Sequence, residues 1–120
     1  MKTIKIKLDS ENYYEHVLKI LKAVPPFDKL KQRELEVYSR LLFHYNKLKT
    51  TYPSETFEQI NNRIFNYDCK KLIEEDLGMT EAAFRNKLLA LRQCNIIDSK
   101  SLKKHFIVTY AENIEFKFIN

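Results

Sequence analysis

Apolar residues recur three and four positions apart through most of the chain, and this spacing predicts several separate helices. Pro25 and Pro26 interrupt the pattern, since proline lacks a backbone N–H and disfavours a helical residue before it. Val37 and Phe43 widen the apolar face of the longest predicted helix, so we expect that helix to be packed on two sides. The helices are expected over residues 10–23, 29–49, a short stretch within 50–62, 68–77 and 80–94.

Strict alternation of apolar and polar residues predicts strands near the two ends of the chain. Residues 2–8 alternate Lys or Thr with Ile or Leu, as a half-buried strand does. Residues 104–110 and 113–119 alternate in the same way, and residues 111–113 allow a turn, so a β-hairpin is expected there.

Residues 66–97 predict two short helices joined by a tight turn. Asp68 is expected to cap the first helix and Thr80 the second, because both side chains accept bonds from first-turn N–H groups. Gly78, the only glycine of the chain, follows the last apolar position of the first helix, where a left-handed residue ends a helix without strain. Met79 is expected to be buried in the turn, and Tyr67 to join the core.

Each of these two helices has one apolar stripe, so each is expected to bury one face. A pair of this kind is a helix-turn-helix, which commonly lays its second helix in the DNA major groove. The stripes consist of Leu72, Ile73 and Leu77 in the first helix and of Phe84, Leu88 and Leu91 in the second.

The run LIEEDLGMTEAAFRNKLLALRQCNIID, residues 72–98, resembles the helix-turn-helix core of winged-helix proteins of bacteria and phages. It departs from that family at Glu74, where a small apolar residue is frequent, and at Cys94–Asn95, where Lys-Gly is frequent. Asn adopts the left-handed conformation more readily than most residues, so Asn95 is expected to end the second helix as glycine does. The matching positions are Ile73, Leu77, Gly78, Met79, Thr80, Phe84, Arg85, Leu88, Leu91, Ile96 and Ile97.

The resemblance implies an α+β fold, a mostly helical winged helix-turn-helix with a C-terminal β-hairpin as its wing. An added N-terminal strand and helix complete the expected fold. We expect residues 1–120 to form a single domain, with an extension over 1–26 and a core over 27–120. Residues 50–62 would be an insertion in that core. Residues 64–65 would form the short strand that winged-helix domains place before the helix-turn-helix.

Composition narrows the class of protein. The chain is 44% apolar, which is typical of a folded domain, and it carries a net charge of +5. An acidic block precedes the second helix of the predicted pair and a basic block begins with it. No apolar run reaches the ~20 residues of a membrane span, and the first residues lack the apolar core of a signal peptide. We therefore expect a cytoplasmic protein, in a host cell or a virion if a phage encodes it.

Catalytic chemistry has no support in the pattern. His16, His44 and His105 are scattered, and Cys69 and Cys94 lack the spacing of a metal site. One glycine cannot form a glycine-rich phosphate loop. We expect no enzymatic activity, no metal and no cofactor.

The second helix of the pair is the candidate site for double-stranded DNA. With its apolar stripe buried, Asn86 would lie on the exposed face and Arg85 on the flank, where Arg can bind guanine and Asn adenine. Alanines near the helix start allow close approach, and nearby lysines and Arg92 could meet phosphates. The predicted DNA-binding residues are Thr80, Ala82, Ala83, Arg85, Asn86, Lys87, Arg92, Lys100, Lys103 and Lys104. Such a protein would act in transcription or replication control.

A protein partner is the alternative. Leu89 is expected on the exposed face of the second helix, where an apolar residue suits a protein better than a groove. The chain would then be a non-enzymatic structural or adaptor subunit, for example of a phage virion or a multi-subunit complex. Tyr13, Tyr14 and Val17 form an apolar face that could also bind a second copy, giving a homodimer or a larger assembly. The strand of residues 2–8 could pair with the hairpin or with another chain.

Overall fold

The described part of the chain forms five α-helices and three short strands, and the strands come from its two ends. The computed structural model describes the backbone of residues 2–7, 13–106, 108–110 and 113–118, and the side chains of residues 18–104 and 106. The elements in chain order are β1 (Lys2–Lys7), α1 (Tyr13–Ala23), the 3-10 turn η1 (Phe27–Lys29), α2 (Gln32–Thr51), α3 (Phe57–Ile64), α4 (Tyr67–Leu77), α5 (Glu81–Gln93), the 3-10 turn η2 (Lys104–Phe106), β2 (Val108–Tyr110) and β3 (Asn113–Phe118).

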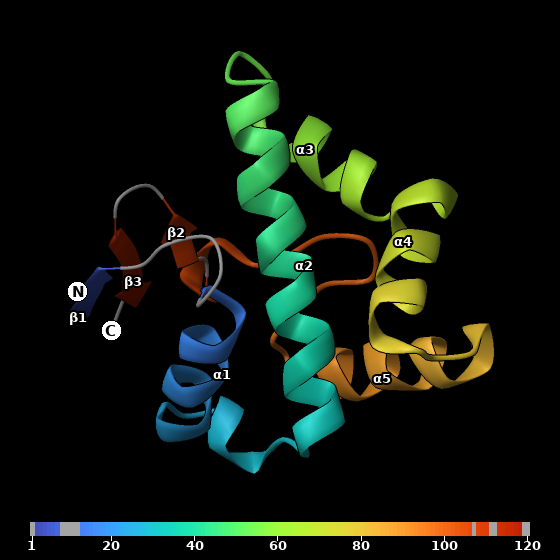
Figure 1. Ribbon diagram of the computed structural model, residues 1–120, viewed down its shortest axis with the longest axis horizontal. Helices are drawn as coiled ribbons and strands as arrows, with labels where there is room; N and C mark the ends of the chain where they lie inside the picture. Colours follow the sequence, from blue (N-terminus) through green and yellow to red (C-terminus); the bar gives the residue numbers. More distant parts are fainter. Residues whose placement is uncertain (1, 8–12, 107, 111–112, 119–120) are drawn as a thin grey trace.

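Helix α2 is the central element, and α1, α3, α4 and α5 all contact it (Figure 1). Nine of its residues are buried, since apolar side chains lie on more than one side of the helix. Val37, Leu41 and Leu42 have no exposed surface. The prediction of a long helix packed on two sides is confirmed. Each such side chain stabilises the fold by roughly 1.5–3 kcal/mol relative to an exposed one.

An aromatic cluster joins the 3-10 turns η1 and η2 to helix α2. The Phe27 ring lies 5.0 Å from the Tyr38 ring and 5.3 Å from the Phe106 ring, centroid to centroid. The Tyr38 hydroxyl donates to the Phe106 carbonyl at 2.7 Å. These contacts fasten both η1 and η2 to α2, because the Tyr38 hydroxyl has its partner and the Phe27 ring packs edge to face against Phe106 and tilted against Tyr38.

Helix α3 confirms the short helix expected within the insertion. Thr56 caps it, accepting a bond from the Gln59 N–H at 3.1 Å. Asn61 is buried beside its apolar stripe and uses both ends of its amide. It donates to the Phe57 carbonyl and accepts from the Leu102 N–H, each at 2.8 Å. A single side chain therefore ties α3 to the segment that follows α5.

The three strands form one antiparallel sheet in the order β1-β3-β2. Lys2 of β1 is opposite Phe118 of β3, and Val108 of β2 is opposite Phe116. The sheet lies on the α1 side of α2, whereas α4 and α5 lie on the other side (Figure 1). The N-terminal strand thus pairs within the chain.

The predicted fold class, a winged helix-turn-helix with a C-terminal β-hairpin as its wing, is wrong. Residues 18–106, the part with described side chains, are 72% helical and contain no strand. The wing sheet also needs the strand predicted at residues 64–65, but Ile64 ends α3 and Phe65 caps it. Residues 64–65 therefore place no strand beside α4, and β3 pairs with β1 on one side and with β2 on the other. The turn expected at residues 111–113 includes 111 and 112, which lie outside the described residues.

Among the described residues, no helix combines the length and the apolar character needed to cross a bilayer. The division into an extension and a core stays a prediction.

Candidate nucleic-acid interface

Helices α4 and α5 are joined by a tight turn with defined ends. Gly78 has φ 62° and ψ 35°, the left-handed conformation that glycine adopts without strain. Its N–H donates to the Glu75 carbonyl at 3.2 Å, and the Met79 N–H donates to the Glu74 carbonyl at 2.9 Å. This bond pair is a Schellman motif, which satisfies the last carbonyls of α4. Gly78 ends α4 as predicted, while Met79 is half-buried rather than buried.

The starts of the two helices differ in how well they were predicted. Thr80 caps α5 as expected, its hydroxyl accepting from the Ala83 N–H at 3.1 Å. The cap of α4 is Asn66, whose side chain accepts from the Cys69 N–H at 2.8 Å. Asp68 is not the cap, so that prediction is wrong. It lies in the first turn of α4, where its charge still favours the positive end of the helix dipole.

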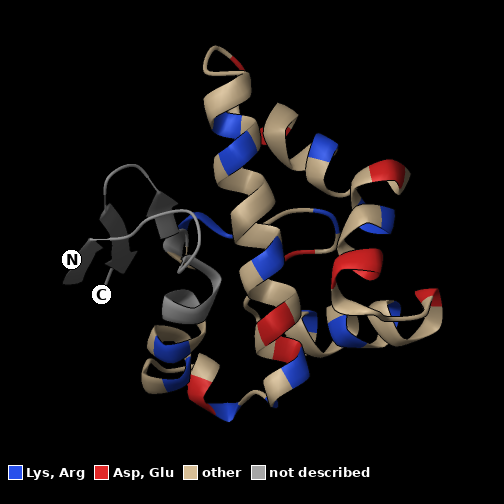
Figure 2. Cartoon of the chain, in the orientation of Figure 1, with Lys and Arg blue, Asp and Glu red and all other residues tan. Residues whose placement is uncertain are grey.

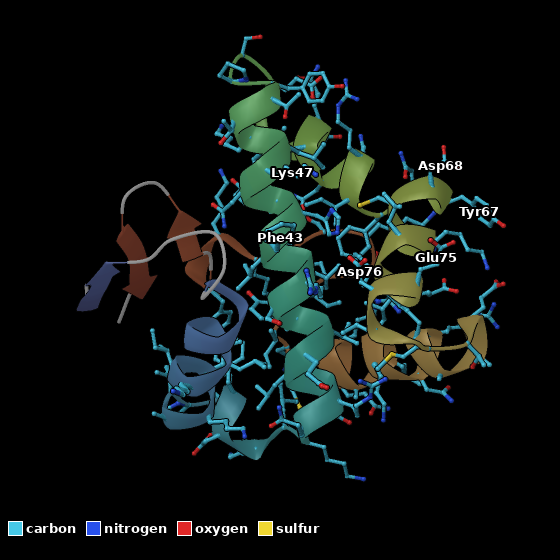
Figure 3. All side chains as sticks on the ribbon, in the orientation of Figure 1. Phe43, Lys47, Tyr67, Asp68, Glu75 and Asp76 are labelled. Atoms are coloured by element: carbon cyan, nitrogen blue, oxygen red, sulfur yellow. The ribbon has the colours of Figure 1, made fainter. Side chains whose placement is uncertain are left out.

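Helix α4 buries less of its predicted stripe than expected. Ile73 is fully buried, but Leu72 is 53% exposed. Tyr67, expected in the core, is 67% exposed and points away from the helix in Figure 3. Glu74 is buried instead, and its carboxylate lies 3.4 Å from the Lys71 ammonium. The only sequence signal for this pair was the departure of Glu74 from the small residue expected there.

Helix α5 has the two faces that its spacing predicted. Phe84, Leu88 and Leu91 are 2%, 5% and 0% exposed, so the predicted stripe is confirmed. The opposite face is open to solvent, and Ala83 and Lys87 at its borders are half-buried. The exposed side chains of α5 include Ala82, Arg85, Asn86, Leu89 and Gln93.

The end of α5 is fixed by a second Schellman motif. Asn95 has φ 60°, its N–H donates to the Arg92 carbonyl at 2.9 Å, and the Ile96 N–H donates to the Leu91 carbonyl at 3.0 Å. The prediction that Asn95 ends the helix is confirmed. The Arg92 guanidinium then donates twice to the Ser99 carbonyl, at 2.6 and 3.1 Å. Arg92 therefore anchors the following loop beside α5.

The predicted phosphate-binding lysines fall into two groups. Lys87, on α5, and Lys100, in the loop held by Arg92, form no ion pair with another described residue. Lys103 lies 3.9 Å from Asp98, and the Lys104 ammonium lies 5.1 Å from the centre of the Phe57 ring of α3. Lys104 thus lies beside α3, away from the exposed face of α5.

The first turn of α5 holds a network of three charges. Glu81 lies 3.0 Å from the Arg85 guanidinium through one carboxylate oxygen and 3.5 Å from the Lys71 ammonium through the other. Arg85 and Glu81 side chains are 70% and 58% exposed. Water screens both pairs strongly at such exposure, so each adds little stability.

A cleft of about 120 Å³ separates α4 from α5 on this side. Cations outnumber carboxylates among its lining residues, and Tyr67, Phe84 and Leu88 add aromatic and apolar surface. Figure 2 shows Lys and Arg along α5 and carboxylates in the lower half of α4. The charged lining residues are Lys70, Lys71, Arg85, Arg92, Glu74 and Glu81.

A separate cluster lies where α4 meets α2. His44 is 8% exposed, and its Nε2 lies 3.8 Å from the Asp76 carboxylate. Burial lowers the pKa of His44, against the opposing effect of Asp76. In Figure 3, Asp76 lies between the two helices, with Phe43 and Lys47 on α2 nearby. Among the described residues, no group of three or more His, Cys, Asp or Glu side chains could hold a metal ion.

The residues proposed for a protein partner are only partly described. Leu89 is 50% exposed, which agrees with its expected place on the outer face of α5. The side chains of Tyr13, Tyr14 and Val17 lie outside the described residues. His16 and His105 do so too.

Comparison of the chain with models of known protein families, with curated proteins and with solved structures gave no match. The geometry of α4 and α5 is therefore the basis for the function proposed below.

Proposed function

We propose that the chain binds double-stranded DNA in a sequence-dependent way, with the exposed face of α5 in the major groove. The observation that carries the proposal is the division of α5 into two faces. One stripe is buried against the core, and the opposite face presents Arg85 and Asn86 to solvent. A helix whose buried face is packed against the core holds its exposed side chains in fixed positions. This arrangement suits hydrogen bonding to base edges.

The chemistry of this face supports base contacts. Arg can donate two bonds to guanine O6 and N7, and Asn can pair with adenine N6 and N7. Ala82 is exposed and Ala83 half-exposed in the first turn of α5, so bulky side chains do not keep a base edge away there. Thr80, the N-cap residue of α5, precedes these alanines at the start of the helix.

The charges around α5 support contacts to phosphates. Lys70 and Lys71 border the cleft on α4, Lys87 lies on α5, and Lys100 lies in the loop beside it. Each phosphate contact adds a slope of about −0.9 to log affinity against log salt concentration. We expect three or four such contacts and thus a slope of roughly −3. Such a protein would serve in transcription or replication control.

Arg85→Ala tests the proposal. A duplex is first selected by the wild-type protein from a random pool, and affinities are then measured for the selected and the random duplex. Loss of one bidentate contact should lower the preference for the selected duplex by about 1–3 kcal/mol. Lys49→Ala, at an exposed position near the far end of α2, removes the same charge and should leave that preference unchanged. Equal small changes for both variants would contradict base reading by Arg85.

A protein-docking role is the second candidate. Leu89, Leu72 and Tyr67 are the large apolar side chains most exposed among the described residues, at 50%, 53% and 67%. Exposed apolar side chains suit a protein partner. A wild-type protein that shifts no duplex at low salt would overturn the DNA proposal and favour a structural or adaptor role, alone or as a homodimer.

A further inference from the structure

The only carboxylate on α5 is Glu81, at the start of the helix and at the edge of the cleft. Its two oxygens are shared between Lys71 of α4 and Arg85 of α5, at 3.5 and 3.0 Å. Both cations are ones that DNA would use in the proposed function. In the free protein, Glu81 therefore competes with DNA for them.

The competition is weak enough to be reversed. Glu81, Lys71 and Arg85 side chains are 58%, 34% and 70% exposed, so water screens the pairs and either cation can exchange partners. The carboxylate itself stays at the DNA-facing end of α5, because Thr80 fixes the first turn. There it repels phosphates on any duplex, whatever the sequence.

Cytosine is the base that suits Glu81 best. A glutamate carboxylate accepts from the N4 amino group of cytosine in the major groove, whereas adenine places its N7 acceptor beside its N6 amino group, and thymine O4 and guanine O6 and N7 are acceptors that repel a carboxylate. Glu81 and Arg85 are one helical turn apart, so the two can address neighbouring base pairs. A cytosine beside the guanine read by Arg85 would release Arg85 and satisfy Glu81 together.

We propose that Glu81 is a specificity-determining residue, which weakens binding to random DNA by holding Lys71 and Arg85 and favours sites that place a cytosine against its carboxylate. This inference rests on the proposed DNA binding by α5. It assigns to one side chain both a penalty against the wrong sequence and a contact with the right one, the combination that specificity requires.

Glu81→Gln tests the penalty, since it removes the charge and keeps the size and helix propensity of the side chain. Affinity for random duplex should rise roughly three- to tenfold, because two screened ion pairs are released. The salt dependence should steepen by about one unit of slope per freed cation. Glu75→Gln is the matched control: it removes the same charge from an exposed position on α4 that does not line the cleft.

Glu81→Asp separates the charge from the reach of the side chain. It keeps the charge, so binding to random duplex should stay as weak as in the wild-type protein. It shortens the side chain, so the preference for cytosine should fall. Random-duplex binding as strong as that of Glu81→Gln would overturn the electrostatic penalty.

Selection from a random pool tests the cytosine contact. The wild-type pool should be enriched in cytosine next to a guanine, and the Glu81→Gln pool should lose the cytosine and keep the guanine. The preference at that position should fall on the order of tenfold.

Circular dichroism melting of each variant checks that the fold is kept. Wild-type protein that binds no duplex would overturn the proposed function itself. Selective wild-type binding with Glu81→Gln indistinguishable from Glu75→Gln would overturn only the role of Glu81.

Discussion

Helices α2 and α5 have similar apolar spacing but are used differently. Nine of the 20 residues of α2 are buried, against three of the 13 residues of α5. Helix α2 contacts every other helix, whereas α5 is packed along one stripe (Figure 1). Helix α5 adds Phe84, Leu88 and Leu91 to the core and leaves its opposite face to solvent.

The difference separates two kinds of residue. Side chains on α2 contribute stability through burial, and most of the side chains on α5 contribute little to it. The polar residues on the exposed face of α5 can therefore vary to suit a binding partner with little effect on stability. Substitutions at the buried positions of α2 should therefore destabilise the protein, and substitutions on the outer face of α5 should change binding alone.

The sharpest test replaces one leucine in each helix. Leu41→Ala, at a position with no exposed surface, should lower the free energy of unfolding by about 2–5 kcal/mol, through lost burial and a cavity. Leu89→Ala, at a side chain 50% exposed, should change it by less than about 0.5 kcal/mol. Urea denaturation measures both. Similar losses for the two variants would show that α5 is covered on both faces, for instance by a second copy of the chain.

A smaller effect is expected at the junction between α4 and α5. Thr80→Ala removes the bond to the Ala83 N–H and should cost about 1 kcal/mol of stability. Thr80→Ser keeps the hydroxyl and should cost much less. If both variants lose the same stability in thermal melts, the methyl group of Thr80 rather than its hydroxyl stabilises the start of α5.

The smallest effect concerns pH, because burial and Asp76 act on His44 in opposite directions. Burial prevails and lowers the pKa of His44 below its ordinary 6.5, so the unfolded chain binds a proton more readily than the folded one. The stability from neutral His44 is present above pH 6.5 and is lost as the pH falls towards the lowered value. His44→Gln should flatten the unfolding free energy between pH 7 and pH 5.5; an unchanged slope would assign the effect to another group.

The spacing of apolar residues predicted α5 well. Phe84, Leu88 and Leu91 are buried as expected. Thr80 begins α5 and Asn95 follows its end, as expected, and Gly78 ends α4. Such signals are local, since a cap or a stripe is formed by residues within a few positions of one another. The positions of Asn66 and Asp68 show the limit of local signals. Both residue types cap helices, and they lie two positions apart.

Contacts between distant segments were not predictable in the same way. The strand expected at residues 64–65 was implied by the winged-helix resemblance, but Ile60 and Ile64 bury a helical stripe instead. The network of Lys71, Glu81 and Arg85 depends on how α4 is placed against α5, which the spacing within either helix leaves open. Arg85 was expected to be a DNA contact, but its carboxylate partner was missed.

Few residue types can replace Asn61 without loss of the fold. Its amide donates to Phe57 and accepts from Leu102 through two separate atoms, whereas a serine or threonine hydroxyl would have to do both through one. Asp would lose the donor and bury a charge, and Leu would leave the Leu102 N–H unpaired. In a library randomised at this position and sorted for folded protein, asparagine should be recovered almost alone. The position would then identify related chains even where the outer face of α5 has changed completely.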